Sequence, residues 1–80
     1  MEEIESRVIN HNGREFVLKL FRADSGFSVV AFLGTHQASP SYSVNLETYM
    51  DYFMQHRERL TDNLFSIAQS DIEHGLYFHA

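Results

Sequence analysis

The side chains in this sequence that are best suited to chemistry are its five histidines, which can bind a metal or transfer a proton near neutral pH. Zinc sites usually take three or four ligands with close local spacing, often including cysteine. The chain has no cysteine, and the nearest approach to a ligand set is Glu73 with two of the histidines. We therefore expect solvent-facing histidines and neither a metal nor another cofactor. The histidines are His11, His36, His56, His74 and His79.

Serine and carboxylate chemistry is equally weakly indicated. A nucleophilic serine needs a nearby base and a third group that holds the base, but no serine lies in a Gly-x-Ser-x-Gly pattern, and Asp24-Ser25-Gly26 has the composition of a turn. The carboxylates spaced four apart, Glu47 with Asp51 and Glu58 with Asp62, are typical of a solvated helix side. The glycines are isolated, so no phosphate-binding loop is predicted. We predict no catalytic residue and no enzymatic activity.

Charge and composition argue against several classes of partner. The net charge is −5, and residues 1–40 carry five acidic and four basic side chains, whereas residues 41–80 carry six acidic and two basic ones. Six Lys and Arg side chains are too few for the clustered positive charge that binds phosphate backbones or anionic membranes. The absence of cysteine, together with an acidic start over residues 1–5, predicts a cytoplasmic protein without a signal peptide.

The first half of the chain has the pattern of an antiparallel sheet. Asn12-Gly13 is typical of a two-residue type I′ hairpin turn, which would pair Val8 with Val17 and Ile4 with Phe21. Directly paired residues share a face, so the hairpin is expected to have two apolar faces. The first face holds Ile9, Phe16, Leu18 and Leu20, and the second holds Ile4, Val8, Val17 and Phe21.

A second turn over residues 23–26 leads into a third strand, Phe27–Leu33. A two-residue loop would place Leu20 opposite Val29. A bulge at Gly26 would instead move the register by one residue and exchange the faces of the third strand. The sequence leaves both registers open.

The second half changes to a helical period after Asn45, which is a suitable N-cap. One unbroken helix would be about 43 Å long at 1.5 Å per residue, far longer than its sheet, and it would place the charged Arg57 on the apolar side. Thr61-Asp62-Asn63 offers a second N-cap. We therefore predict two helices over about 46–58 and 62–74, with a single long helix as the alternative.

The expected fold is a single α+β domain over residues 1–80. Residues 4–45 form an antiparallel β-meander of three to four strands, with a loop over 34–40 and an edge strand over 41–44. Residues 46–75 form one or two C-terminal helices packed on one sheet face. A meander followed by helices is too common to indicate a family or a function.

The most informative feature is a surplus of apolar residues over what one helical layer can cover. Large contiguous apolar patches are rare on monomers and usually mark contact surfaces. We therefore predict a non-enzymatic protein-binding module, a homodimer or a partner of another protein. The alternative is that the second helix or the tail Leu76–Phe78 covers the second sheet face. The expected interaction residues are Ile4, Val8, Val17, Phe21, Tyr52, Phe65 and Tyr77.

Two further hypotheses come from other classes of function. One is a small-ligand or enzyme-accessory domain with a pocket between sheet and helices. The other is a nucleic-acid-associated regulator, which the acidic charge disfavours. The pocket would be lined by Tyr42, Tyr49, Phe53 and His36, and nucleic acid would be bound by Arg7, Arg14, Lys19 and Arg22.

Overall fold

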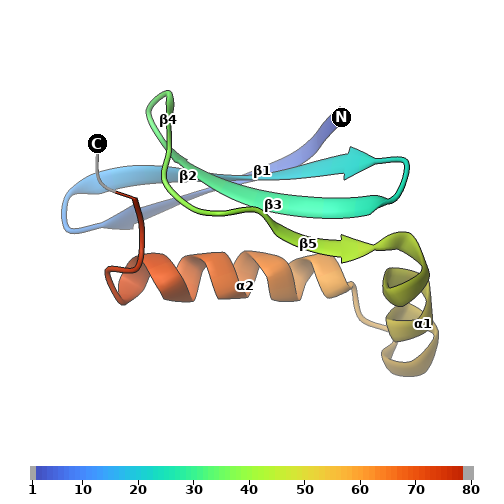
Figure 1. Ribbon diagram of the computed structural model, residues 1–80. Helices are drawn as coiled ribbons and strands as arrows, with labels where there is room; N and C mark the ends of the chain where they lie inside the picture. Colours follow the sequence, from blue (N-terminus) through green and yellow to red (C-terminus); the bar gives the residue numbers. More distant parts are fainter. Residues whose placement is uncertain (1, 79–80) are drawn as a thin grey trace.

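A computed structural model describes residues 2–78, which form a five-stranded sheet and two helices (Figure 1). β1, β2 and β3 form an antiparallel meander, and β4 and β5 both pair with the remaining edge of β3. The predicted α+β fold, with helices on one face of a meander, is confirmed. The elements are β1 (Glu2–His11), β2 (Arg14–Ala23), β3 (Gly26–Leu33), β4 (His36–Gln37), β5 (Tyr42–Asn45), α1 (Leu46–His56) and α2 (Leu60–Glu73).

The hairpin between β1 and β2 turns at Asn12 and Gly13. Their φ angles of 52° and 76° are the two positive values that a type I′ turn requires. Asparagine and glycine tolerate this conformation better than other residues. The turn sets the predicted pairing of Val8 with Val17, which is confirmed.

Near its N-terminus, β1 contains a β-bulge that the sequence pattern did not indicate. Glu5 lies opposite Leu20 and Glu3 lies opposite Phe21, so Ile4 is an extra residue in β1. The predicted pairing of Ile4 with Phe21 is therefore wrong, because the bulge shifts the register by one residue. β1 is an edge strand, and a bulge flanked by charged side chains hinders pairing with another chain along this edge.

The turn between β2 and β3 has the two-residue loop, which settles the register that the sequence left open. Ala23 lies opposite Gly26, and Leu20 lies opposite Val29. Gly26 has a φ of 154°, and a Cβ at this position would collide with the carbonyl oxygen of Val44 in β5. Glycine is therefore required here because β5 approaches the start of β3 closely.

The outer edge of the sheet is one interrupted strand. β4 pairs with the end of β3, which corrects the prediction of a continuous loop over residues 34–40, and β5 pairs with its beginning. Between them, Ser39 Oγ accepts a 2.8 Å hydrogen bond from the Ala31 N–H and donates to the Pro40 carbonyl at 2.9 Å. The hydroxyl of Ser39 thus satisfies a buried backbone donor where the edge strand breaks.

Helix α1 follows β5 without a connecting loop. Its predicted N-cap is confirmed, because Asn45 Oδ1 accepts a 2.7 Å hydrogen bond from the Thr48 N–H. The helix ends at Arg57, which has a left-handed φ of 57° and donates its N–H to the Phe53 carbonyl at 2.8 Å. This turn separates the two helices, so the single long helix is excluded.

Helix α2 begins two residues earlier than predicted. Arg59 is its N-cap and makes no side-chain capping bond, so the predicted cap at Thr61-Asp62-Asn63 is wrong. Thr61 is instead buried in the first turn, where it accepts a 3.3 Å hydrogen bond from Arg59 Nε. At the other end the Gly75 and Leu76 N–H groups donate to carbonyls of the last turn at 3.0 and 2.7 Å, which closes the helix in a Schellman motif.

The core lies between α2 and one face of the sheet (Figure 1). Residues of alternate positions along β2 and β3 point towards α2, as the period of two in a strand requires. Burial of each large side chain contributes about 1.5–3 kcal/mol. The core residues are Phe16, Leu18, Leu20, Val29, Ala31, Ala38, Leu64, Phe65, Ala68 and Ile72.

A network of charges fastens edge strand β1 to the start of α2. Arg7 donates to Glu5 at 3.0 Å and to Asp62 at 2.7 Å, and Arg59 donates to Glu5 at 2.9 Å. The Arg7 guanidinium also lies 4.0 Å from the centre of the Phe65 ring. The hydrogen bond from Arg59, opposed by partial burial, lowers the pKa of Glu5. This network joins β1 to the start of α2, two segments that are far apart in the sequence.

The C-terminal tail returns to the core side of the sheet and does not cover its other face. The Tyr77 and Phe16 rings lie 5.0 Å apart in an edge-on arrangement, and the Phe78 N–H donates to the Ala38 carbonyl at 2.8 Å. In Figure 1 the tail rises from the end of α2 towards the level of the sheet. Self-coverage of the second face by the tail or by α2 is therefore excluded for residues 2–78.

Candidate protein-binding surfaces

Neither helix lies over the sheet face opposite α2 (Figure 1), and the strand register places further apolar residues on this face. The register places these residues on one face, because directly paired residues share a face: Val17 pairs with Val8 and Phe32, and Lys19 pairs with Val30. We refer to this set as the open face. It consists of Val8, Val17, Phe21, Val30 and Phe32.

The open face keeps a substantial part of its apolar surface in contact with solvent. Val8 is 56% exposed, and the neighbouring bulge residue Ile4 is 46% exposed. Val17, Phe21 and Phe32 are half-buried, and Val30 is buried at 7% exposure. These residues lie on three adjacent strands, so they form one contiguous patch rather than the scattered apolar side chains that any protein surface contains.

The charge on the open face is nearly balanced. Lys19 lies in the middle of the face, with its Nζ 3.4 Å from Glu3 Oε1 and 5.3 Å from the centre of the Phe32 ring. The aliphatic stem of a lysine adds apolar contact surface to such a patch. Serines border the face on the β5 side, where Ser28 and Ser43 hydroxyls lie 3.0 Å apart.

The seven residues that the sequence indicated as an interaction surface do not lie together. Val8, Val17 and Phe21 share the open face, with Ile4 in the adjoining bulge. The other three lie elsewhere: Tyr52 on α1, Phe65 in the core at 2% exposure and Tyr77 against Phe16. Phe65 and Tyr77 belong to the packing of this chain, because helical periodicity alone does not distinguish a core stripe from a docking stripe.

A second apolar surface lies on α1, which the sequence predicted to pack on the sheet face. α1 buries none of its residues, because it extends past the end of the sheet rather than along it (Figure 1). The continuity of β5 and α1, with no connecting residues, is the sequence signal that could have indicated this. We call this set the α1 stripe. It consists of Leu46, Met50, Phe53 and Met54.

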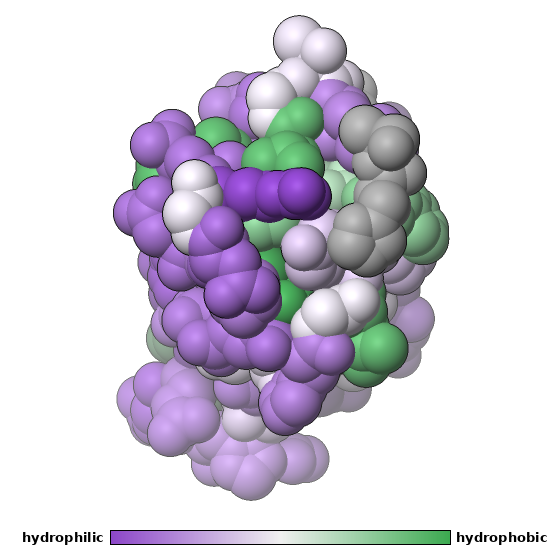
Figure 2. Space-filling model, turned by 90° about the vertical axis from the view of Figure 1, so that its left-hand side faces the viewer, coloured by the Kyte–Doolittle hydropathy of each residue, from purple (hydrophilic) through white to green (hydrophobic). Residues whose placement is uncertain are grey.

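The end of the molecule that is distant from α1 has a different character. Figure 2 shows it as mainly hydrophilic, with hydrophobic residues in small separate areas. The β1–β2 turn and the end of α2 lie at this end (Figure 1). The described residues at this end therefore form no extended apolar surface comparable to the open face or to α1.

The pocket that the sequence suggested between sheet and helices is not formed by the expected residues. The Tyr42 hydroxyl donates to Asp71 Oδ2 at 2.6 Å, and the Tyr49 ring packs on Phe27 with 4.7 Å between centroids. Burial, and secondly the bond to Asp71, raises the pKa of Tyr42 to about 12. Phe53 is largely exposed. Both tyrosines are thus used in holding the fold together.

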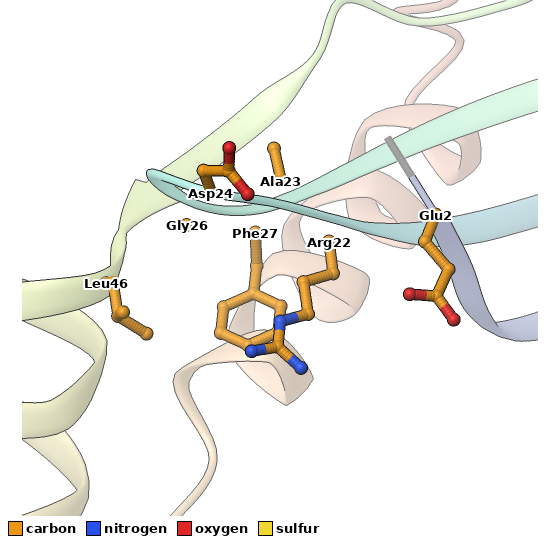
Figure 3. A pocket seen from close by; sticks show the side chains of 7 residues that line it. All are labelled: Glu2, Arg22, Ala23, Asp24, Gly26, Phe27 and Leu46. Carbon is orange, nitrogen blue, oxygen red and sulfur yellow. The ribbon is translucent and has the colours of Figure 1, made fainter.

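A shallow pocket of about 550 Å³ lies instead beside the start of α1 (Figure 3). Its charged side chains are Glu2, Asp24 and Arg22, and Figure 3 shows the Arg22 side chain beside the Phe27 ring. The mixture of charges does not favour a free anion or cation. Its walls are completed by Ala23, Gly26, Phe27 and Leu46.

The histidines and the basic residues do not assemble into sites within the described part of the chain. No group of three or more His, Cys, Asp or Glu side chains in residues 2–78 is placed to hold a metal ion, and His79 lies outside these residues. His36 is partly buried and its Nε2 has no hydrogen-bond partner. Arg7 and Lys19, two of the four basic residues weighed for nucleic acid, lie on opposite faces of the sheet in ion pairs.

The chain was compared with known proteins at the levels of sequence and structure. No protein-family model, no curated protein and no solved structure gives a significant match. Neither helix of residues 2–78 has the length and hydropathy needed to cross a bilayer.

Proposed function

We propose that this protein is a non-enzymatic, cytoplasmic protein-binding module and that its open face binds the open face of a second copy. The observation that supports the proposal is the apolar patch on β1, β2 and β3, which neither helix covers and which leaves Val8 largely exposed and Val17, Phe21 and Phe32 half-exposed. Removal of such a patch from water is favourable by about 25 cal/mol per Å². Two sheets packed in this way would form a small β-sandwich across a two-fold axis.

The dimensions of the open face suit a weakly associating dimer. A ten-residue strand is about 33 Å long, and three strands spaced about 4.8 Å apart give a sheet plane of roughly 500 Å² per subunit. A two-fold contact over this whole plane would therefore bury at most about 1,000 Å² in total. This value lies at the lower limit of specific interfaces, where weak and transient contacts are found.

The charge distribution supports a second copy as the occupant. The chain has a net charge of −5, but six of its eleven carboxylates lie in residues 41–80, which form β5 and the two helices. On the open face, Lys19 already pairs with Glu3. Two open faces can therefore approach each other without opposing clusters of like charge, which would otherwise weaken the association.

Sedimentation equilibrium from 5 to 500 μM tests the proposal. We expect the wild-type mass to rise from the monomer value of 9.3 kDa towards twice that value. Val8→Asp should remain monomeric, because Val8 is largely exposed in the single chain but would be buried in the dimer. Gln69→Asp, an exposed position on α2, is the matched control and should dimerise normally.

Thermal melts by circular dichroism verify that both variants fold. A wild-type chain that stays monomeric at 500 μM would refute the proposal. The same conclusion would follow if Val8→Asp dimerised as well as Gln69→Asp.

A further inference from the structure

The α1 stripe is an exposed apolar surface on one side of α1, separate from the open face of the sheet. Leu46, Met50, Phe53 and Met54 follow the i, i+4, i+7, i+8 spacing of one helix side. Met50 is 52% exposed and Met54 is 71% exposed. The apolar side of an amphipathic helix normally packs against the core of its own protein, whereas in α1 this side faces solvent.

The orientation of α1 is fixed by its other side. Tyr49 packs on Phe27, and the Tyr52 hydroxyl accepts a 3.0 Å hydrogen bond from Asn63 Nδ2 in α2. A helix of eleven residues is too short to be stable alone in water, so these contacts and the Asn45 cap hold it in place. They turn the stripe outwards, because Met50 and Met54 lie on the side of the helix away from Tyr52.

The charge beside the stripe selects the kind of partner. Glu47 and Asp51 are four residues apart and lie next to Met50 and Met54 around the helix. Neither carboxylate has an ion-pair partner among the described residues. Two like charges at this spacing repel each other, and a cation from a partner would relieve the repulsion.

A second copy of this chain does not supply a matching cation to the α1 stripe. A two-fold contact between two α1 stripes would bring both acidic pairs together. Of the chain's six Lys and Arg side chains, Arg7, Lys19 and Arg59 are already in ion pairs, and the others do not share one helix side: Arg14 and Arg22 lie near the two ends of β2 and Arg57 at the end of α1. The occupant must therefore supply its own basic residues.

We propose that the α1 stripe binds a basic amphipathic helix of another protein. The apolar side of that helix would cover Met50, Phe53 and Met54, while its Lys or Arg residues would pair with Glu47 and Asp51. Flexible methionines adapt to differently shaped apolar side chains, which suits such a surface. This site is separate from the open face and does not depend on dimerisation.

The pocket of Figure 3 extends the proposed site at one end. Leu46 belongs to the stripe and also lines this pocket, together with the carboxylates of Glu2 and Asp24. Arg22 also lines the pocket, so its mixed charges select no cation, and Leu46 is the part of it that adds to the proposed contact.

The test uses a fluorescein-labelled 18-residue peptide of leucine and lysine with leucine at helical spacing, and measures anisotropy with the full chain. We expect saturable binding with a dissociation constant below 100 μM. A peptide of the same composition in scrambled order, and a leucine–glutamate peptide, should bind at least tenfold more weakly. Equal binding of the scrambled peptide would overturn the proposal, as would no saturation up to 1 mM.

Variants locate the binding on the molecule. Asp51→Lys should weaken binding at least fivefold, and Met50→Ser/Met54→Ser at least tenfold. Glu73→Lys makes the same change of net charge at the far end of α2 and should change binding less than twofold. Equal losses in Asp51→Lys and Glu73→Lys would mean attraction by overall charge alone, which contradicts the proposal.

A final variant separates this proposal from the first. Val8→Asp should still bind the peptide with unchanged affinity, whether or not the wild type dimerises. If Val8→Asp abolished peptide binding while its circular dichroism melt showed a folded chain, the peptide would be bound by the open face, and the assignment to α1 would be wrong.

Discussion

The hydrogen bond between Tyr42 in β5 and Asp71 in α2 gives the sharpest prediction about stability. Tyr42→Phe removes only the hydroxyl, which donates at 2.6 Å to a carboxylate. Hydrogen bonds to charged groups contribute about 1.5–3 kcal/mol. Solvent screens this bond because the tyrosine is only partly buried, so we expect a loss of about 1–2 kcal/mol. Since 1 kcal/mol shifts the melting temperature of a chain this small by about 4–8 °C, the melt should move by roughly 5–15 °C.

The same bond predicts how stability depends on pH. The pKa of Tyr42 is raised from 10.0 to about 12 in the folded chain. The contribution of the hydroxyl to stability is therefore fully present below pH 10 and is lost as the pH rises through 12. A tyrosinate absorbance step near pH 12 should be present in the wild type and absent in Tyr42→Phe.

Tyr52→Phe is the matched control. Its hydroxyl bonds to Asn63 at 3.0 Å and to Glu58 at 3.5 Å on the surface, and its removal should reduce the free energy of unfolding by less than about 0.5 kcal/mol. Urea denaturation of the three proteins at pH 7 supplies the values. Equal losses in the two variants, or a pH 12 step that persists in Tyr42→Phe, would refute the role assigned to Tyr42.

Three other changes test separate features of the fold. Arg57→Gly should raise the free energy of unfolding by about 0.5–1 kcal/mol in urea titrations, because Arg57 holds a left-handed φ of 57°; a loss would contradict this. Gly26→Ala should lower it by at least about 2 kcal/mol, because a Cβ would collide with the Val44 carbonyl, and wild-type stability would disprove the close approach of β5. The hydrogen bond from Arg59 lowers the pKa of Glu5, so the stability contributed by the Glu5 carboxylate is present above about pH 4.5 and is lost as the pH falls through the folded pKa. Thermal melts should show that Glu5→Gln loses less stability on acidification than the wild type, by less than about 1 kcal/mol. An equal loss in the two proteins would exclude a stabilising Glu5–Arg59 ion pair.

Local signals in the sequence were sufficient for the fold because turn and cap chemistry is local. Asn12-Gly13 determines the first hairpin, and Asn45 caps α1, as predicted. The second cap was misplaced because Thr61 is buried by α2 packing on the sheet, where its hydroxyl bonds to Arg59. A tertiary contact took precedence there over a local preference.

The candidate surfaces could be predicted only in part. The open face follows from strand alternation and register, and the bulge at Ile4 altered one pairing without moving the apolar patch. The α1 stripe was not predicted, because a helical period shows which side is apolar but not what covers it. The direction in which α1 leaves β5, fixed by contacts such as Tyr49 on Phe27, decides that the stripe is exposed.

Concentration-dependent nuclear magnetic resonance shifts test the function of the open face most directly. Spectra of the isotope-labelled chain recorded between 20 μM and 1 mM identify the residues that change environment on self-association. We predict that the methyl signals of Val8, Val17 and Val30 shift together along one binding curve, while those of Met50 and Met54 stay in place. Shifts confined to the methionines, or no shifts at all, would contradict the binding of a second copy by the open face.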